Sequence, residues 1–480
     1  MLQSRPLRND AIEIWKSGLN AVDARTLVKK NVLIEDQQLR IGPKSFPIDK
    51  IENVVVVGFG KASGAMAVGL EEGILTDSSV SDLGFNLSGL ICVPDDRVVQ
   101  TKHIKIVGGR PAGENLPTER VQKTTGEILN LIESTGPNDV CVCLVSGGGS
   151  ALLELPIEPI TIDEFRSATS FLSGSGASIY QLNAVRRAIS SVKGGSLARA
   201  AGQTPIVSLI ISDVIGDNLD VISSGPTVQP TSTASAISAI EVLQTFDPDR
   251  TGIPSSIWEA IESNSKPVVE FEAGAAVDNF IIGNIETAIE AAKEKAIQLG
   301  YACELGQPSG NEGDAETIGR QVPAHIEQLL SRGNKQCFIQ GGETTVKLCD
   351  NPGHGGRNQH LVLAAIDEFV SLPKELIGDF CLLSGGTDGE DGSAPESGIA
   401  GAIADREAIQ RIGKLKTEDV KSALLNCNSF EFHLAQDNLL RVGSDGNSAS
   451  QESGAAKSQE DSNLASTNVC DLRIVLAEAD

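Results

Sequence analysis

Short runs of apolar, largely β-branched residues alternate with longer segments of helical periodicity between residues 51 and 222. Each run stops at glycines or polar residues, as a strand buried on both faces of a parallel sheet does. The predicted strands are residues 54–57, 89–93, 140–145 and 206–211. Strands that alternate with helices in this way predict a doubly wound α/β domain.

The same alternation restarts after a passage rich in proline, serine and acidic residues at 226–267. We interpret this passage as a linker with one short helix, at 234–243. Beyond it, strands are predicted at 279–282, 337–340, 380–383 and 472–476. The predicted fold class is α/β with two doubly wound, Rossmann-like domains and an active site in the cleft between them. The predicted limits are 1–250 for the N-terminal domain, 251–275 for a connector and 276–480 for the C-terminal domain.

Residues 444–466 break this pattern, because they are almost entirely Ser, Gly, Ala, Asn, Gln and charged residues. Such a segment cannot bury enough apolar surface to offset the entropy of ordering it. We therefore expect a disordered or mobile insertion, which the chain follows with the strand at 472–476.

The 480 residues carry a formal net charge of −25. This argues against nucleic-acid and membrane partners, which are bound by clustered Lys and Arg. The nine cysteines include no C-x-x-C pair, so neither a zinc site nor a disulfide framework is expected. We predict a cytoplasmic protein. Residues 1–8, with two arginines and no acid, leave a mitochondrial address as the alternative.

The first predicted strand leads into a glycine-rich turn that carries its own cation. Gly58, Gly60 and Gly64 surround Lys61 in the sequence G-F-G-K-A-S-G. Glycines let backbone N–H groups approach an anion, a following helix presents its positive N-terminus, and Lys61 adds a full charge. The spacing matches neither the dinucleotide fingerprint nor the P-loop, so a plain strand-to-helix turn is the alternative.

Three further strands run into glycine-rich turns, at 146–150, 341–343 and 384–388. In open α/β sheets ligands bind at the carboxyl ends of strands, so these turns predict a binding site. The residues that we assign to them are Ser146, Gly147, Gly148, Gly149 and Ser150 in the first, Gly341, Gly342 and Glu343 in the second, and Asp388 in the third.

Residues 183–193 have helical periodicity with two faces. Val185, Ile189 and Val192 form an apolar stripe. A second stripe, formed by Asn183, Arg186, Ser190 and Lys193, predicts either an anion-binding wall or a solvated helix surface.

Carboxylates follow two of the predicted strands. Asp213 and Asp217 come after the strand at 206–211 and are candidates for holding Mg²⁺ or accepting a hydroxyl proton, with helix capping as the alternative. Asp388 and Asp391 have the same alternatives. Arg357 lies in the loop P-G-H-G-G-R-N-Q, where a planar two-donor cation suits phosphoryl oxygens.

Together these motifs resemble the glycerate 2-kinase family, two-domain kinases with a C-terminal MOFRL domain that were once labelled hydroxypyruvate reductases. The resemblance runs from about residue 11 to the C-terminus. Its carrying motifs are G-F-G-K-A at 58–62, S-G-G-G-S-A-L at 146–152, K-G-G at 193–195, S-D-V-I-G-D at 212–217, S-G-P-T at 224–227, G-G-E at 341–343, G-G-R-N-Q at 355–359 and S-G-G-T-D-G at 384–389.

The resemblance implies ATP- and Mg²⁺-dependent phosphorylation of D-glycerate to 2-phosphoglycerate. It implies catalytic roles for Lys61 and Arg357, which would clamp the γ-phosphoryl group, and makes Asp213 the candidate for Mg²⁺ or the hydroxyl proton. We expect residues 146–150, Arg186 and Lys193 to hold glycerate, and Gly58, Gly60, the 341–343 turn and Asp388 to hold the nucleotide. A homodimer is a further expectation.

Three departures from the family pattern keep other interpretations open. His360 replaces the usual Glu after R-N-Q, Asn428-Ser429 lacks the acid of an N-D-S element, and the closing glycine-rich loop is interrupted after Gly443. These departures favour the alternative of a catalytically impaired sugar-acid-binding homologue. A second alternative, an NAD(P)-dependent hydroxypyruvate reductase, rests on the glycine turn after the strand at 54–57. The reductase needs a ribose-binding acid about twenty residues after the first glycine turn, for which Asp77 is the candidate.

Overall fold

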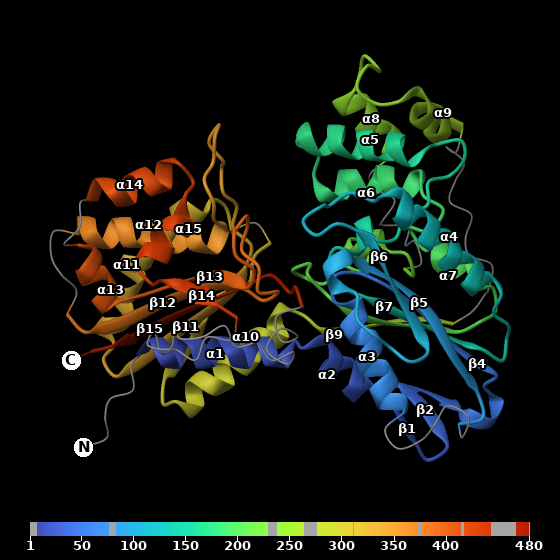
Figure 1. Cartoon of the computed structure of the whole chain (residues 1–480), viewed down its shortest axis with the longest axis horizontal. Coiled ribbons are helices and arrows are strands. Elements are labelled where there is room, and N and C mark those ends of the chain that lie inside the picture. The colour runs from blue at the N-terminus through green and yellow to red at the C-terminus, as the bar shows by residue number, and fades with distance from the viewer. Residues whose placement is uncertain are drawn as a thin grey trace. The chain divides into compact units, whose positions relative to one another are not determined.

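The computed structural model describes residues 7–75, 83–228, 238–263, 276–310, 312–372, 377–413, 417–442 and 467–479. The chain forms two compact units (Figure 1). The N-terminal unit is Ala24–Ile282, and the C-terminal unit joins Met1–Asp23 to Gly283–Asp480. The units are therefore not consecutive along the chain, unlike the domains predicted from the sequence. The predicted insertion at 444–466 lies outside the described residues.

A six-stranded sheet forms the centre of the N-terminal unit, in the order β6-β5-β4-β7-β8-β9. The pairs from β6 to β8 are parallel. The bounds are β4 (Asn53–Phe59), β5 (Asn86–Pro94), β6 (Ile104–Arg110), β7 (Val140–Val145), β8 (Ile206–Ile211) and β9 (Val277–Gly283). Every residue of β7 and β8 is buried, which explains their uninterrupted apolar runs. All four strands predicted for this half of the chain are confirmed.

The strand predicted at 279–282 forms, but in a different sheet from the one expected. We predicted that it opens the second domain, whereas β9 lies beside β8 at the edge of the first sheet, where Ile206 N–H donates to the Ala276 carbonyl at 3.0 Å. Strand pairing is decided by contacts distant in sequence, so the apolar run alone did not reveal this partner. A small antiparallel sheet of β1 (Val32–Glu35), β2 (Gln38–Ile41) and β3 (Lys44–Pro47) was also not predicted.

Helices complete the N-terminal unit. They are α2 (Ala24–Asn31), α3 (Ser63–Ile74), α4 (Glu119–Glu133), α5 (Ile162–Gly174), α6 (Ile179–Ala188), α7 (Ser196–Ala200), α8 (Ala239–Phe246) and α9 (Ser255–Ser263). α5, α6, α8 and α9 share a separate apolar core that includes Phe165, Leu243 and Trp258 (Figure 1). The predicted linker therefore contains a second helix, α9, which buries Ile257 and Trp258. We did not predict it because an isolated helix of this length is marginal without its packing partners.

The C-terminal unit contains a second six-stranded sheet, in the order β10-β11-β15-β12-β13-β14. β10 and β11 are parallel and the other pairs are antiparallel. The bounds are β10 (Ala302–Leu305), β11 (Lys335–Gly342), β12 (Asp379–Gly386), β13 (Ile399–Asp405), β14 (Leu439–Arg441) and β15 (Asp471–Glu478). The α/β class is confirmed, with a mixed second sheet in which the last strand lies between β11 and β12.

Helices cover both faces of this sheet, with α1 and α10 on one face and α11 and α12 on the other (Figure 1). The bounds are α1 (Leu7–Ala21), α10 (Ile285–Gln298), α11 (Ala315–Ser331), α12 (Arg357–Ser371), α13 (Arg406–Ile412), α14 (Thr417–Leu425) and α15 (Ser429–Ala435). Leu361, Val362 and Ile366 of α12 are fully buried. This packing fixes the first residue of α12, Arg357, at one end of the sheet. Among the described residues, no helix has the length and apolar content needed to cross a bilayer.

Candidate active site

The glycine turns after β4 and β7 meet at the point where the strand order of the first sheet reverses. β4 pairs with β5 on one side and β7 on the other, and such a switch point is where open α/β sheets bind ligands. Lys61 N–H donates to the Gly147 carbonyl at 2.9 Å, and Ala62 N–H donates to Ser146 Oγ at 3.0 Å. The two turns thus form one hydrogen-bonded structure.

Gly60 permits this close approach. Its φ is +134°, and a Cβ there would lie 2.5 Å from the Ser146 carbonyl oxygen. Gly58, by contrast, lies inside β4, where a Cβ would come within 2.8 Å of the Leu144 carbonyl oxygen. Close packing between neighbouring strands therefore explains why a glycine is needed at position 58. Contact of Gly58 with a nucleotide stays a prediction.

Two cationic side chains and one carboxylate surround the 146–150 turn. A Cβ on Gly148 would lie 3.5 Å from both Lys61 Cγ and Arg110 Nη2. A Cβ on Gly147 would lie 2.5 Å from Asp213 Oδ2. The structure therefore brings together Lys61, Asp213 and the 146–150 turn, as predicted. Arg110 was missed, although its place at the end of β6 was the available signal.

A magnesium ion bound with a nucleotide needs only one or two protein carboxylates, because phosphates and water supply its remaining ligands. Asp213 fits this role, since its carboxylate lies against the glycine turn. Asp217 lies four residues further on, with a φ of +53°. No three His, Cys, Asp or Glu side chains within the described ranges are grouped to hold a metal by themselves.

The predicted helix at 183–193 is wrong in its second half. α6 ends at Ala188, after which Ser190 bridges to Pro156 and Ser191 N–H donates to the Leu155 carbonyl at 2.8 Å. The chain leaves the helix because pairing with the segment after the 146–150 turn satisfies its backbone. Asn183 and Lys193 therefore do not share a helical face.

Lys193 and Glu154 form an internal ion pair, and neither side chain has exposed surface. Lys193 Nζ donates to the Ser150 and Leu153 carbonyls at 3.1 and 3.0 Å and lies 3.5 Å from Glu154 Oε2. Burial lowers the pKa of Lys193 to about 8, against the opposing charge of Glu154. Burial likewise lowers the pKa of the half-buried Arg186. Direct contact of Arg186 with a substrate stays a prediction, whereas the Lys193 side chain, which has no exposed surface, is not placed to touch one.

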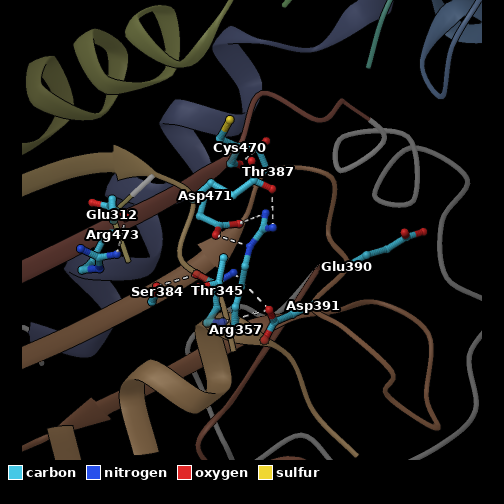
Figure 2. A network of polar contacts seen from close by, with 12 residues as sticks. Glu312, Thr345, Arg357, Ser384, Thr387, Glu390, Asp391, Cys470, Asp471 and Arg473 are labelled. Atoms are coloured by element: carbon cyan, nitrogen blue, oxygen red, sulfur yellow. Dashed lines mark hydrogen bonds and ion pairs between the residues drawn. The ribbon is translucent and has the colours of Figure 1, made fainter. Parts of the chain in front are cut away.

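In the C-terminal unit, Arg357 projects from the start of α12 toward the first residue of β15 (Figure 2). Its Nε and Nη2 donate to the two carboxylate oxygens of Asp471 at 2.6 and 3.0 Å, and its Nη1 donates to Glu343. Burial would lower the pKa of Arg357, but Asp471 and Glu343 outweigh it and raise that pKa. The guanidinium is therefore a permanent cation with a fixed orientation.

Asp391 holds the helix end that carries Arg357 (Figure 2). Its carboxylate accepts from the backbone N–H groups of Asn358 and Gln359 at 3.0 and 2.9 Å. Burial, with the charge of Asp471, raises the pKa of Asp391 to about 6 against these donors. Of the alternatives considered for Asp391, the structure thus supports capping, although the capped helix precedes it in the chain.

The glycine turns after β11 and β12 are brought together by β15. Asp471, the first residue of β15, is opposite Gly342 on one side and Gly386 on the other. Thr387 Oγ1 donates to the Cys470 carbonyl and accepts from Val469 N–H, both at 2.8 Å. Sequence reasoning missed Asp471, because it follows the segment at 444–466 and has no motif of its own. Asp388 accepts from Glu390 N–H at 3.2 Å within its own turn.

Comparison with known proteins agrees with this architecture. A domain of unknown function, DUF4147, matches residues 10–262, and the MOFRL family matches residues 336–471. A glycerate 2-kinase of Pyrococcus horikoshii is 31% identical over 92% of this chain and 95% of its own length. A D-glycerate 2-kinase of Thermotoga maritima is 31% identical over 93% and 97%, and a glycerate kinase of Mus musculus is 30% identical over 90% and 89%.

Solved structures of similar fold include a glycerate kinase. The crystal structure of a glycerate kinase from Thermotoga maritima has a TM-score of 0.73 and 29% identity, covering 98% of this chain and 99% of its own. A Pyrococcus horikoshii protein has a TM-score of 0.74 and 28% identity, with both chains fully covered. With both domain families in order and this extent of identity, the chain belongs to the glycerate 2-kinase family.

Proposed function

We propose that this protein transfers the γ-phosphoryl group of ATP to D-glycerate and releases 2-phosphoglycerate and ADP. The observation that carries the proposal is full-length similarity to proteins named glycerate kinase and glycerate 2-kinase. The reductase alternative is not favoured by these relatives. Its candidate ribose-binding acid, Asp77, lies outside the described residues.

Phosphoryl transfer requires alignment of the two substrates and neutralisation of the charge on the transferred group. We assign Lys61 to this second task in the N-terminal unit, because it projects from a turn whose backbone is tied to Gly147. Residues 146–150 are assigned to glycerate. Mg²⁺ bound with the nucleotide would be held by Asp213 and would neutralise phosphate charge. Asp213 is also the candidate acceptor for the hydroxyl proton.

Arg357 is assigned to the transferred phosphoryl group as well. Three of its five N–H bonds are directed at Asp471 and Glu343, which leaves one on Nη1 and one on Nη2 for an anionic substrate. Two N–H donors on neighbouring nitrogens of one guanidinium suit a pair of phosphoryl oxygens. Glu343 and the neighbouring Gly341, Gly342 and Asp388 are assigned to the nucleotide.

Glycerate-dependent ADP release tests the proposal directly. The purified protein is assayed with ATP, Mg²⁺ and D-glycerate, and the phosphoglycerate isomer is identified by NMR. Hydroxypyruvate-dependent NAD(P)H oxidation is measured in parallel. ADP release with 2-phosphoglycerate supports the proposal, reductase activity without it supports the alternative, and the absence of both supports a binding protein. A cytoplasmic location and a homodimer remain predictions.

A further inference from the structure

Lys193 is the chemically unusual group near the 146–150 turn. A buried lysine loses the hydration of its ammonium group, and this loss must be offset by partners. Here the partners are two backbone carbonyls, of Ser150 and Leu153, and the carboxylate of Glu154. All three partners lie at residues 150–154, where the chain leaves the glycine turn. The buried ammonium therefore holds this part of the chain in one conformation.

The residues around Lys193 hold the same turn from a second side. Gly194 N–H donates to the Ser224 carbonyl at 3.0 Å, and Ser150 Oγ lies 2.9 Å from Ser224 Oγ. Ser224 Oγ in turn donates to Asn183 Oδ1 at 2.9 Å. Residues 193–194 therefore link the two segments: the Lys193 side chain binds the 146–153 segment, and Gly194 N–H binds the 222–226 segment.

An apolar pair of similar volume would fill this interior at a lower desolvation cost. Such a pair has no hydrogen-bond donor for the Ser150 and Leu153 carbonyls. These carbonyls would remain unsatisfied, or the backbone would shift to find other donors. The specific contribution of Lys193 is thus geometric: it determines where the end of the turn lies.

We propose that Lys193 and Glu154 are positioning residues for the hydroxy acid. Lys193 fixes the Ser150 and Leu153 carbonyls and hence the shape of the 146–150 turn, and Glu154 keeps Lys193 in place. This inference rests on the proposed function, because that function assigns the turn to glycerate. Neither residue touches the substrate in this arrangement, so their effect on catalysis is transmitted through the turn.

The decisive variant is the double substitution Lys193→Met with Glu154→Met, which keeps the interior filled and leaves no unpaired buried charge. We expect its KM for D-glycerate to rise about tenfold or more, since small displacements of binding groups are costly, while its KM for ATP changes less than about twofold. Glu154→Gln removes only the charge that keeps Lys193 in place and retains both of its carbonyl acceptors, so the KM for glycerate should rise by only about threefold, less than in the double variant.

A matched control separates positioning from loss of stability. The Asp247 carboxylate accepts from the backbone N–H groups of Thr251, Gly252 and Ile253 at 2.9 Å in the helical part of the same unit. Asp247→Asn should lower the unfolding midpoint without changing the ratio of the two KM values. If the double Met variant does not fold, Lys193→Gln is the second test. Its shorter amide cannot reach both carbonyls, so the same selective rise in KM is expected.

A folded double Met variant with unchanged KM for glycerate would overturn the inference. An equal change in the KM values for glycerate and for ATP, which leaves their ratio unchanged as expected for Asp247→Asn, would overturn it as well. Failure of the proposed function is distinguishable, because the wild-type protein would then release no ADP in response to glycerate.

Discussion

Replacement of Arg357 by lysine should separate catalysis from stability. In the structure, Nε and Nη2 bind the two oxygens of Asp471, and Nη1 binds Glu343. A lysine ammonium has three donors from a single point, so it cannot bind both carboxylates and still present two N–H donors to a phosphoryl group. The positive charge is kept, but the geometry is lost.

The expected magnitudes differ for the two properties. Loss of one preorganised donor to a developing anion costs about 10²-fold in kcat, equivalent to about 2.7 kcal/mol. Arg357→Ala leaves the buried Asp471, whose side chain is 5% exposed, without its cation. Because water reaches the partly exposed arginine site, we expect a loss of about 2 kcal/mol in unfolding free energy, and about 1 kcal/mol for Arg357→Lys.

The assay is coupled ADP release with saturating D-glycerate and ATP, together with urea unfolding of the same preparations. Arg357→Lys and Arg357→Ala should have similarly low kcat values although the lysine variant is the more stable protein. If Arg357→Lys retains kcat within about fivefold of wild type, the two-donor role is refuted and the residue serves only as a source of positive potential.

Three further predictions follow from the described side chains. Lys61→Met should lower kcat about 10²-fold with an unchanged unfolding midpoint, because the half-buried side chain contributes little to packing while its backbone bond to Gly147 remains; near-normal turnover in the folded variant would contradict the assignment. Asp213→Asn should raise the Mg²⁺ concentration needed for half-maximal activity about tenfold, measured by Mg²⁺ titration at fixed ATP; an unchanged Mg²⁺ dependence with reduced kcat would instead favour the proton-accepting role. Burial lowers the pKa of His433 to about 4 from 6.5, so its stabilising effect is complete above pH 6.5 and is lost as the pH falls toward 4. His433→Gln should therefore flatten the decrease in unfolding free energy over this window by about 3 kcal/mol, measured by urea unfolding at each pH. The raised pKa of Asp391 has the opposite effect, with ionisation reducing stability as the pH rises from 3.8 to about 6, and it is common to both proteins. An equal slope in the variant would contradict the assignment to His433.

Local pattern was sufficient for the eight strands that were predicted, all of which form, and for the position of the first glycine turn. β7 and β8 match the predicted ranges residue for residue, because a strand buried on both faces must be apolar throughout. The position of Lys61 beside the 146–150 turn also followed from sequence, since parallel strands place their carboxyl ends at one edge of a sheet. Recognition of the family rested on motif order and needed no structure.

Pairing and burial were decided only by the tertiary structure. The sequence places Asp471 after a long low-complexity segment, yet β15 inserts between β11 and β12 and brings this carboxylate to Arg357. It presents Lys193 as one polar position on a helix, yet the helix ends early and the side chain is fully buried with Glu154. The hydrophobic periodicity of a segment indicates the backbone geometry of that segment. The residues that a segment contacts depend on which distant segments bury surface together, and these tertiary contacts are a property of the whole fold.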